Sequence, residues 1–136
     1  EIETNVFNVS SRINSTWGGQ LVDMVRARKI LEIYEEDNVI ENVRKSGAHL
    51  LKKLHELQEK HPNAISNVRG KGLICAFDLP DTATRDAFAK HGWDKGVMFL
   101  GAATKTIRFR PTLTITTDEI DQGMAVADEV LTEMGH

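Results

Sequence analysis

The sequence predicts an α/β domain in which a small sheet of about three strands is covered by helices and preceded by two more. Residues 20–57 contain two successive helical patterns, and residues 73–109 contain three short apolar runs bounded by Gly or Pro. A last helical pattern follows Thr116. Helical periodicity on both sides of short strand-like runs favours a domain of two packed layers.

The first helix is predicted over residues 20–36, where apolar residues recur at three-to-four spacing on more than one face. We expect such a helix to leave an exposed apolar surface in the isolated chain. Asn38 and Glu41 then have the spacing of a capping box, and Pro62 closes the helix that follows. The apolar stripe of this second helix comprises Val39, Val43, Gly47, Leu50, Leu54 and Leu57.

The first strand is predicted over residues 73–79, a compact apolar run that ends at Pro80. A short helix, capped by Asp81 or Thr82, is expected to reach about Trp93. This helical crossover indicates that the next strand is a parallel neighbour of the first.

Two further strands are predicted over residues 97–100 and 106–109, with a turn at residues 101–103 between them. The short link suits an antiparallel hairpin. Thr116 and Glu119 form a second capping-box pattern. The helix that they open has one apolar face, made of Ile120, Met124, Ala127, Leu131 and Met134.

The composition restricts the class of protein. A length of 136 residues suits one domain, and a formal net charge of −3 argues against a nucleic-acid binder. No apolar run approaches the roughly 20 residues that a membrane span needs. The single cysteine, Cys75, excludes an intrachain disulfide and fits a reducing compartment, so a cytoplasmic location is expected. We interpret the start at Glu1 as the start of a piece of a longer chain, and a processed terminus is the alternative.

The segment Asn14-Ser15-Thr16-Trp17-Gly18-Gly19 directly precedes the first helix. Hydroxyl groups, glycine N–H groups and a helix N-terminus together favour a bound phosphate or carboxylate. The alternative is that a Ser or Thr before a helix acts only as its N-cap.

Arg108 and Arg110 lie on one face of the third predicted strand, opposite Ile107 and Phe109. The planar guanidinium group fits a carboxylate in two parallel hydrogen bonds, so this pair could form an anion site. The alternative is two solvated arginines on the outer face of the sheet.

The other candidates are weak. The five histidines contain no pair at metal-ligand spacing, and no metal site is expected. Cys75 lies inside an apolar run and is interpreted as a core residue, and Gly70-Lys71-Gly72 precedes a strand and so differs from a phosphate loop. Residue chemistry alone therefore predicts an α/β domain with a possible anion-binding loop and no complete catalytic set.

Two segments nevertheless resemble a known family. Residues 7–19, Phe-Asn-Val-Ser-Ser-Arg-Ile-Asn-Ser-Thr-Trp-Gly-Gly, are similar to the segment after the catalytic lysine in class III aminotransferases of the lysine 6-aminotransferase branch. Residues 107–114, Ile-Arg-Phe-Arg-Pro-Thr-Leu-Thr, resemble the C-terminal segment of that branch and of 4-aminobutyrate aminotransferases. Arg69-Gly70-Lys71-Gly72-Leu73-Ile74, between them, resembles the entry into the family's small-domain sheet.

The resemblance implies the C-terminal part of a fold type I enzyme that uses pyridoxal phosphate and works as a homodimer. It implies that Thr16, with Ser15 beside it, binds the cofactor phosphate of the neighbouring subunit. It also implies that Arg108 binds a substrate carboxylate and that Asn14 borders the substrate pocket. The lysine that forms the Schiff base with the cofactor is expected upstream, so this chain carries no catalytic residue of its own.

The expected division is a cofactor-phosphate segment at residues 1–19 and a small domain with its leading helices at residues 20–136. The expected activity is transfer of the terminal amino group of L-lysine to 2-oxoglutarate, with the isolated chain inactive. Two alternatives remain. One is a 4-aminobutyrate or other omega-amino-acid aminotransferase, and the other is a stand-alone α/β module that binds a partner or a small molecule.

Overall fold

The computed structural model describes residue 4, residues 8–10, residue 12 and residues 15–136. The chain divides into two compact units, residues 1–37 and residues 38–136, and each is described by itself. Asn14, one of the predicted site residues, lies outside the described residues.

The described part of the first unit is dominated by helix α1, Leu21–Glu36, close to the predicted 20–36. No side chain of α1 is buried, and its exposed large apolar residues include Leu21, Val22, Met24, Val25, Ile30, Leu31 and Ile33. The expectation that this helix carries an exposed apolar surface is confirmed.

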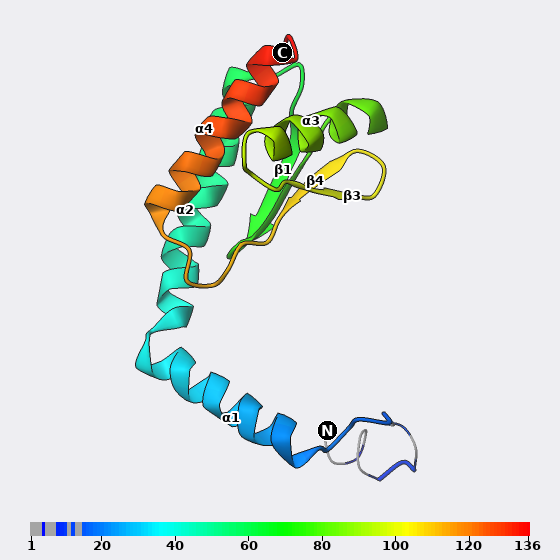
Figure 1. The fold of residues 1–136 in the computed structure, drawn as a ribbon, viewed down its shortest axis with the longest axis vertical. Helices are drawn as coiled ribbons and strands as arrows, with labels where there is room; N and C mark the ends of the chain where they lie inside the picture. The colour runs from blue at the N-terminus through cyan, green and yellow to red at the C-terminus, as the bar shows by residue number, and fades with distance from the viewer. Residues whose placement is uncertain (1–3, 5–7, 11, 13–14) are drawn as a thin grey trace. The chain divides into compact units, whose positions relative to one another are not determined.

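The described second unit contains a four-stranded sheet and three helices (Figure 1). The helices are α2 (Val39–Lys60), α3 (Thr82–Asp94) and α4 (Thr117–Glu133), and the strands are β1 (Ser66–Lys71), β2 (Ile74–Asp78), β3 (Leu100–Ala102) and β4 (Thr106–Phe109). The α/β class is confirmed, with one strand more than the predicted three.

The additional strand is β1, which pairs antiparallel with β2. Its sequence, Ser-Asn-Val-Arg-Gly-Lys, has no apolar alternation, because β1 lies at the edge of the sheet and none of its residues is buried. Gly70 and Gly72, interpreted as a lead-in to the first strand, instead belong to the hairpin that joins β1 to β2.

The strand order is β1-β2-β4-β3, and every neighbouring pair is antiparallel. The prediction that the strand after α3 neighbours β2 is wrong, because β4 lies between them. Since β2 and β3 are both antiparallel to β4, they do run in the same direction, as the crossover through α3 requires. The arrangement is a β–α–β unit split by an inserted strand.

The strand predicted at residues 97–100 begins later, at Leu100, and the turn predicted at residues 101–103 moves to residues 103–105. The cause lies at the end of α3, where the backbone N–H of Val97 donates to the carbonyl oxygen of Gly92 at 2.8 Å. Residues 97–99 therefore follow the helix end, and pairing with β4 starts only beyond them.

The core lies between one face of the sheet and the helices, and α2 and α4 run side by side along it (Figure 1). Its fully buried side chains include Leu54, Phe77, Phe88, Ile107 and Leu131. Phe77 meets Phe88 edge-on at 5.8 Å between ring centroids. The predicted stripes of α2 and α4 are the faces that these helices bury.

The two predicted capping boxes have different outcomes. Thr116 accepts from the backbone N–H of Glu119, whose carboxylate accepts from the backbone of Thr116 in return, so this box is confirmed. Asn38 makes no capping bond, and that prediction is wrong. Its backbone is left-handed, with φ of 51°, whereas an N-cap has extended backbone. Glu41 pairs with Arg44 instead.

Candidate functional site

The segment before α1 forms a turn rather than a helix cap. The backbone N–H of Gly18 donates to the carbonyl oxygen of Ser15 at 3.0 Å, and Gly19 has a φ of 80°, which favours glycine. The N-cap of α1 is Gln20, which makes no side-chain capping bond. The alternative that Ser15 or Thr16 caps the helix is therefore contradicted.

Ser15, Thr16 and both glycines are exposed in this turn. Two hydroxyl groups and an uncapped helix N-terminus suit the phosphate group of pyridoxal phosphate, because a phosphate needs hydrogen-bond donors. The backbone can approach a phosphate closely only where side chains are small, as at the two glycines. Among the described residues, neither hydroxyl group has a hydrogen-bond partner. The residues present therefore fit a phosphate group.

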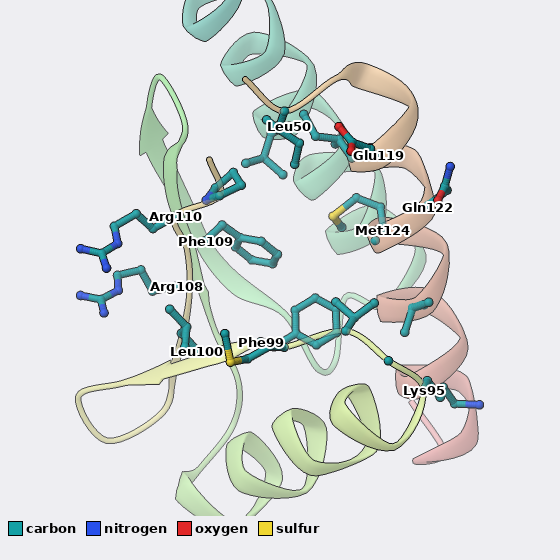
Figure 2. Close-up of a pocket in the computed structure, with 18 residues that line it drawn as sticks. Leu50, Lys95, Phe99, Leu100, Arg108, Phe109, Arg110, Glu119, Gln122 and Met124 are labelled. Carbon is teal, nitrogen blue, oxygen red and sulfur yellow. The ribbon is translucent and has the colours of Figure 1, made fainter. Parts of the chain in front are cut away.

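The second half of the predicted site lies on β4. Arg108 is exposed, whereas Ile107 is fully buried on the opposite face. Figure 2 shows the side chains of Arg108 and Arg110 pointing the same way, away from Phe109 and Met124. The prediction that the two arginines share one face is confirmed.

The arginines lie on the face of the sheet opposite the core, which we call the open face. Its residues on the two central strands are Ile74, Ala76 and Asp78 of β2 and Thr106 and Arg108 of β4. It contains a depression of about 290 Å3 lined in part by Arg69, Ala76, Thr106 and Arg108. Among the described residues, Arg108 forms no ion pair and no side-chain hydrogen bond. Its guanidinium group is available for a carboxylate.

Asp78 is the acidic residue of the open face, and its side chain is 13 % exposed. The Thr106 hydroxyl donates to its Oδ1 at 2.7 Å, and Arg69 Nη1 donates to the same oxygen at 3.1 Å. Asn67 donates to Oδ2 at 2.8 Å. Burial alone would raise the pKa of Asp78, but the three donors outweigh it and hold the pKa below its ordinary 3.8.

The sequence does not predict this cluster. The available signal was an aspartate that ends an apolar strand, but two of its three partners, Asn67 and Arg69, come from the edge strand β1, which has no apolar pattern. The register of that strand brings Asn67 and Arg69 to Asp78, and no local spacing in the sequence indicates it.

A larger cavity of about 610 Å3 lies on the other side of β4 (Figure 2). Residues of α4, of the segment before β3 and of β4 line it, among them Phe99, Phe109 and Met124. Its lining is largely apolar, and it also includes Arg108 and Arg110.

Cys75 has the environment expected of a core residue. Cys75 is buried, and its burial raises the pKa of the thiol, which suits a core residue better than a nucleophile. Gly72 has a φ of 57° and forms the β1–β2 turn rather than a phosphate loop.

In the described part of the chain, no group of three potential ligands could hold a metal ion. None of the helices described there combines the length and the apolar character that a membrane span requires.

Comparison with known proteins gives one consistent family. The family model described as "Aminotransferase class-III" matches residues 3–131. The chain is 46% identical over 136 residues to an L-lysine-epsilon aminotransferase of Amycolatopsis lactamdurans, covering 99% of this chain and 30% of that protein. It is 38% identical over 106 residues to 4-aminobutyrate aminotransferase, mitochondrial, of Sus scrofa, covering 78% of this chain and 21% of that protein.

Solved structures agree with this result. A lysine aminotransferase from Mycobacterium tuberculosis superposes with a TM-score of 0.85 at 46% identity, covering 96% of this chain and 30% of that chain. An S-selective transaminase from Arthrobacter sp. superposes with a TM-score of 0.84 at 26% identity, covering 98% of this chain and 33% of that chain. The chain thus spans between about a fifth and a third of the length of these relatives.

Proposed function

Because the chain belongs to the class III aminotransferases, we propose that it is the C-terminal part of an enzyme that transfers the terminal amino group of L-lysine to 2-oxoglutarate. The observation that carries the choice of lysine is the identity to L-lysine-epsilon aminotransferases over nearly the whole chain. Identity to the 4-aminobutyrate enzymes is lower and covers less of the chain, so that activity is the second candidate.

In the proposed enzyme, residues 1–19 contribute to the cofactor site, and residues 20–136 form the small domain with its leading helices. Thr16 and Ser15 bind the phosphate of pyridoxal phosphate held mainly by the partner subunit of a homodimer. This role of the two residues is supported by their place in an exposed turn before α1 and by the lack of a side-chain cap at the N-terminus of that helix. The bound cofactor supplies an electron sink for the carbon that exchanges its amino group.

Arg108 binds a carboxylate of the amino-acid or oxo-acid substrate, and Asn14 borders the same pocket. Arg108 stands on a strand that is paired on both sides, which fixes its backbone, while its guanidinium group has no partner among the described residues. A guanidinium group that is held in place and has no other partner can orient a planar carboxylate through two parallel hydrogen bonds. The exposed apolar face of α1 would be covered by the rest of the full-length protein.

The decisive experiment compares amino donors. The full-length protein, with pyridoxal phosphate and 2-oxoglutarate, is supplied with L-lysine or 4-aminobutyrate, and glutamate formation is measured. We expect kcat/KM to be at least about tenfold higher for lysine, which corresponds to ~1.4 kcal/mol of transition-state binding. A preference for 4-aminobutyrate would select the second candidate, and no turnover of any amino donor would favour a binding module.

The 136-residue chain is the control in this assay, because the cofactor-bearing lysine is expected upstream. We expect it to form no glutamate with either donor. Catalysis by the isolated chain would show that a lysine within it carries the cofactor.

A cytoplasmic location for the proposed enzyme is tested by fractionating the source cells.

A further inference from the structure

The carboxylate of Asp78 stands diagonally opposite Arg108 on the open face. In the pairing of β2 with β4, Asp78 is opposite Thr106, and Ala76 is opposite Arg108. Residues at such diagonal positions lie roughly 7–8 Å apart, with their Cβ atoms somewhat closer, and an arginine side chain can span this distance. The most obvious partner for Arg108 within this sheet is therefore Asp78, and a pair between them would occupy the proposed carboxylate receptor.

The structure shows no such pair between these two described residues, and both oxygens of Asp78 already accept hydrogen bonds from other donors. Thr106 and Arg69 donate to Oδ1 at 2.7 and 3.1 Å, and Asn67 donates to Oδ2 at 2.8 Å. The guanidinium group of Arg69 is itself anchored, because its Nη1 also donates to the carbonyl oxygen of Asn67 at 2.8 Å. Arg69 reaches Asp78 from β1, and its Nη2 also donates to the hydroxyl oxygen of Thr106 on β4 at 3.5 Å.

We propose that Arg69 is a positioning residue that, together with Thr106 and Asn67, keeps Asp78 from pairing with Arg108 and so leaves Arg108 available to the substrate carboxylate. This inference rests on the proposed role of Arg108. Without the charge of Arg69, Asp78 becomes a largely buried carboxylate with no opposite charge, which is costly. A shift of the Arg108 side chain along the open face would supply that charge.

The proposal differs from a purely structural role for the Arg69–Asp78 pair in what a second substitution does. If the Arg69–Asp78 pair is purely structural, the second substitution can relieve the unpaired buried charge, but the Nε–Hε signal of Arg108 stays unchanged in both variants. If Arg69 shields Arg108, replacing Asp78 by Asn in the Arg69→Gln background removes the competitor. The carboxylate site is then restored although the ion pair is still missing.

The test uses the full-length protein loaded with pyridoxal phosphate, and the probe is glutarate, a dicarboxylate without an amino or oxo group. Calorimetry measures its dissociation constant for the natural protein, Arg69→Gln, and Arg69→Gln with Asp78→Asn. The matched control is Lys71→Gln, which removes the same charge from the same face of β1 two residues away. The Lys71 side chain forms no ion pair or hydrogen bond with any described residue.

We expect Arg69→Gln to weaken glutarate binding by about tenfold, the loss typical of one hydrogen bond to a charged group. The double variant should return to within about threefold of the natural protein, and Lys71→Gln should stay within the same range. An equal loss in the double variant, or an equal loss in Lys71→Gln, would overturn the proposal. So would unchanged binding in Arg69→Gln.

A second variant covers the case in which Arg69→Gln does not fold. Thr106→Val removes one donor to Asp78 while it keeps a β-branched residue in the strand. It should weaken glutarate binding by a smaller factor, and adding Asp78→Asn should reverse that loss. Failure of this reversal would also overturn the proposal.

A substrate-free readout separates this inference from the proposed function. In the 15N-labelled 136-residue chain, the Nε–Hε signal of Arg108 should shift in Arg69→Gln and return in the double variant. If the signal moves and returns but the full-length protein transaminates no amino acid, the shielding stands and the proposed function fails. If the signal does not move, the shielding fails whatever the protein catalyses.

Discussion

Helix α2 contacts the β1–β2 turn through a pair of glycines, and this contact gives a sharp prediction. A Cβ atom added at Gly47 would lie 2.5 Å from the carbonyl oxygen of Gly72 and closer still to its carbonyl carbon. Real Cβ atoms essentially never come within 3.0 Å of a heavy atom that is not in their own residue or its chain neighbours. The neighbour is backbone, so the whole turn would have to move away from the helix to accept Gly47→Ala.

The cost of that movement competes with a gain. Alanine stabilises a helix interior by about 1 kcal/mol relative to glycine, but overpacking of this kind costs about 1–3 kcal/mol, and more where backbone must shift. We therefore expect Gly47→Ala to lower the free energy of unfolding by about 1–2 kcal/mol. Gly123→Ala in α4 is the matched control, because its added Cβ meets nothing within 4 Å and it should stabilise the chain by about 0.5–1 kcal/mol.

Urea denaturation followed by circular dichroism measures both variants. The two substitutions are chemically identical and both lie inside a helix, so the propensity gain cancels in the comparison. A stabilised Gly47→Ala variant, equal to Gly123→Ala, would refute the reasoning, since it would mean that α2 does not approach the turn so closely.

Three further predictions concern the proposed sites. In the full-length protein, Arg108→Lys keeps the charge but loses the fork of donors, so kcat/KM should fall at least about tenfold; a larger fall for Arg110→Lys would show that the wrong arginine was assigned. Thr16→Val should weaken cofactor retention about tenfold or more, measured by dialysis, through loss of a hydrogen bond to a charged phosphate; unchanged retention would exclude that contact. Because the pKa of Asp78 is lowered, the ionised carboxylate stabilises the fold above about pH 4, and this stabilisation is lost as the pH falls through the pKa of the folded state. Chemical denaturation at stepwise lower pH should therefore show a smaller acid-induced loss of unfolding free energy for Asp78→Asn than for the natural protein. An identical loss would contradict the assignment.

The parts of the fold that sequence analysis predicted are those in which local pattern and tertiary environment agree. The stripe of α2 and the capping box at Thr116 were found because burial and capping follow fixed spacings along one element. The predictions failed where contacts with another segment of the chain determine the local structure. Strand β1 forms only because β2 offers it a partner, and β3 starts late because residues 97–99 are tied to the end of α3.

The candidate site divides in the same way. The shared face of Arg108 and Arg110 follows from strand alternation and was predicted. The Asp78 cluster was not, because its residues come from β1, β2 and β4 and meet only through the register of the sheet. The predicted capping box at Asn38 is wrong for a different reason. The spacing to Glu41 fits a capping box, but the backbone of Asn38 is left-handed, whereas an N-cap has extended backbone.

The insertion of β4 between β2 and β3 also has a consequence for how the chain is made. During synthesis, β1, β2, α3 and β3 leave the ribosome before β4, and until residue 106 has emerged β2 and β3 lack the strand that joins them. The open edge of β2 is then exposed to pairing with other nascent chains. The strand that carries Arg108 closes this gap, so the sheet and the proposed carboxylate receptor are completed by the same late event, and a polypeptide truncated before it would lack both.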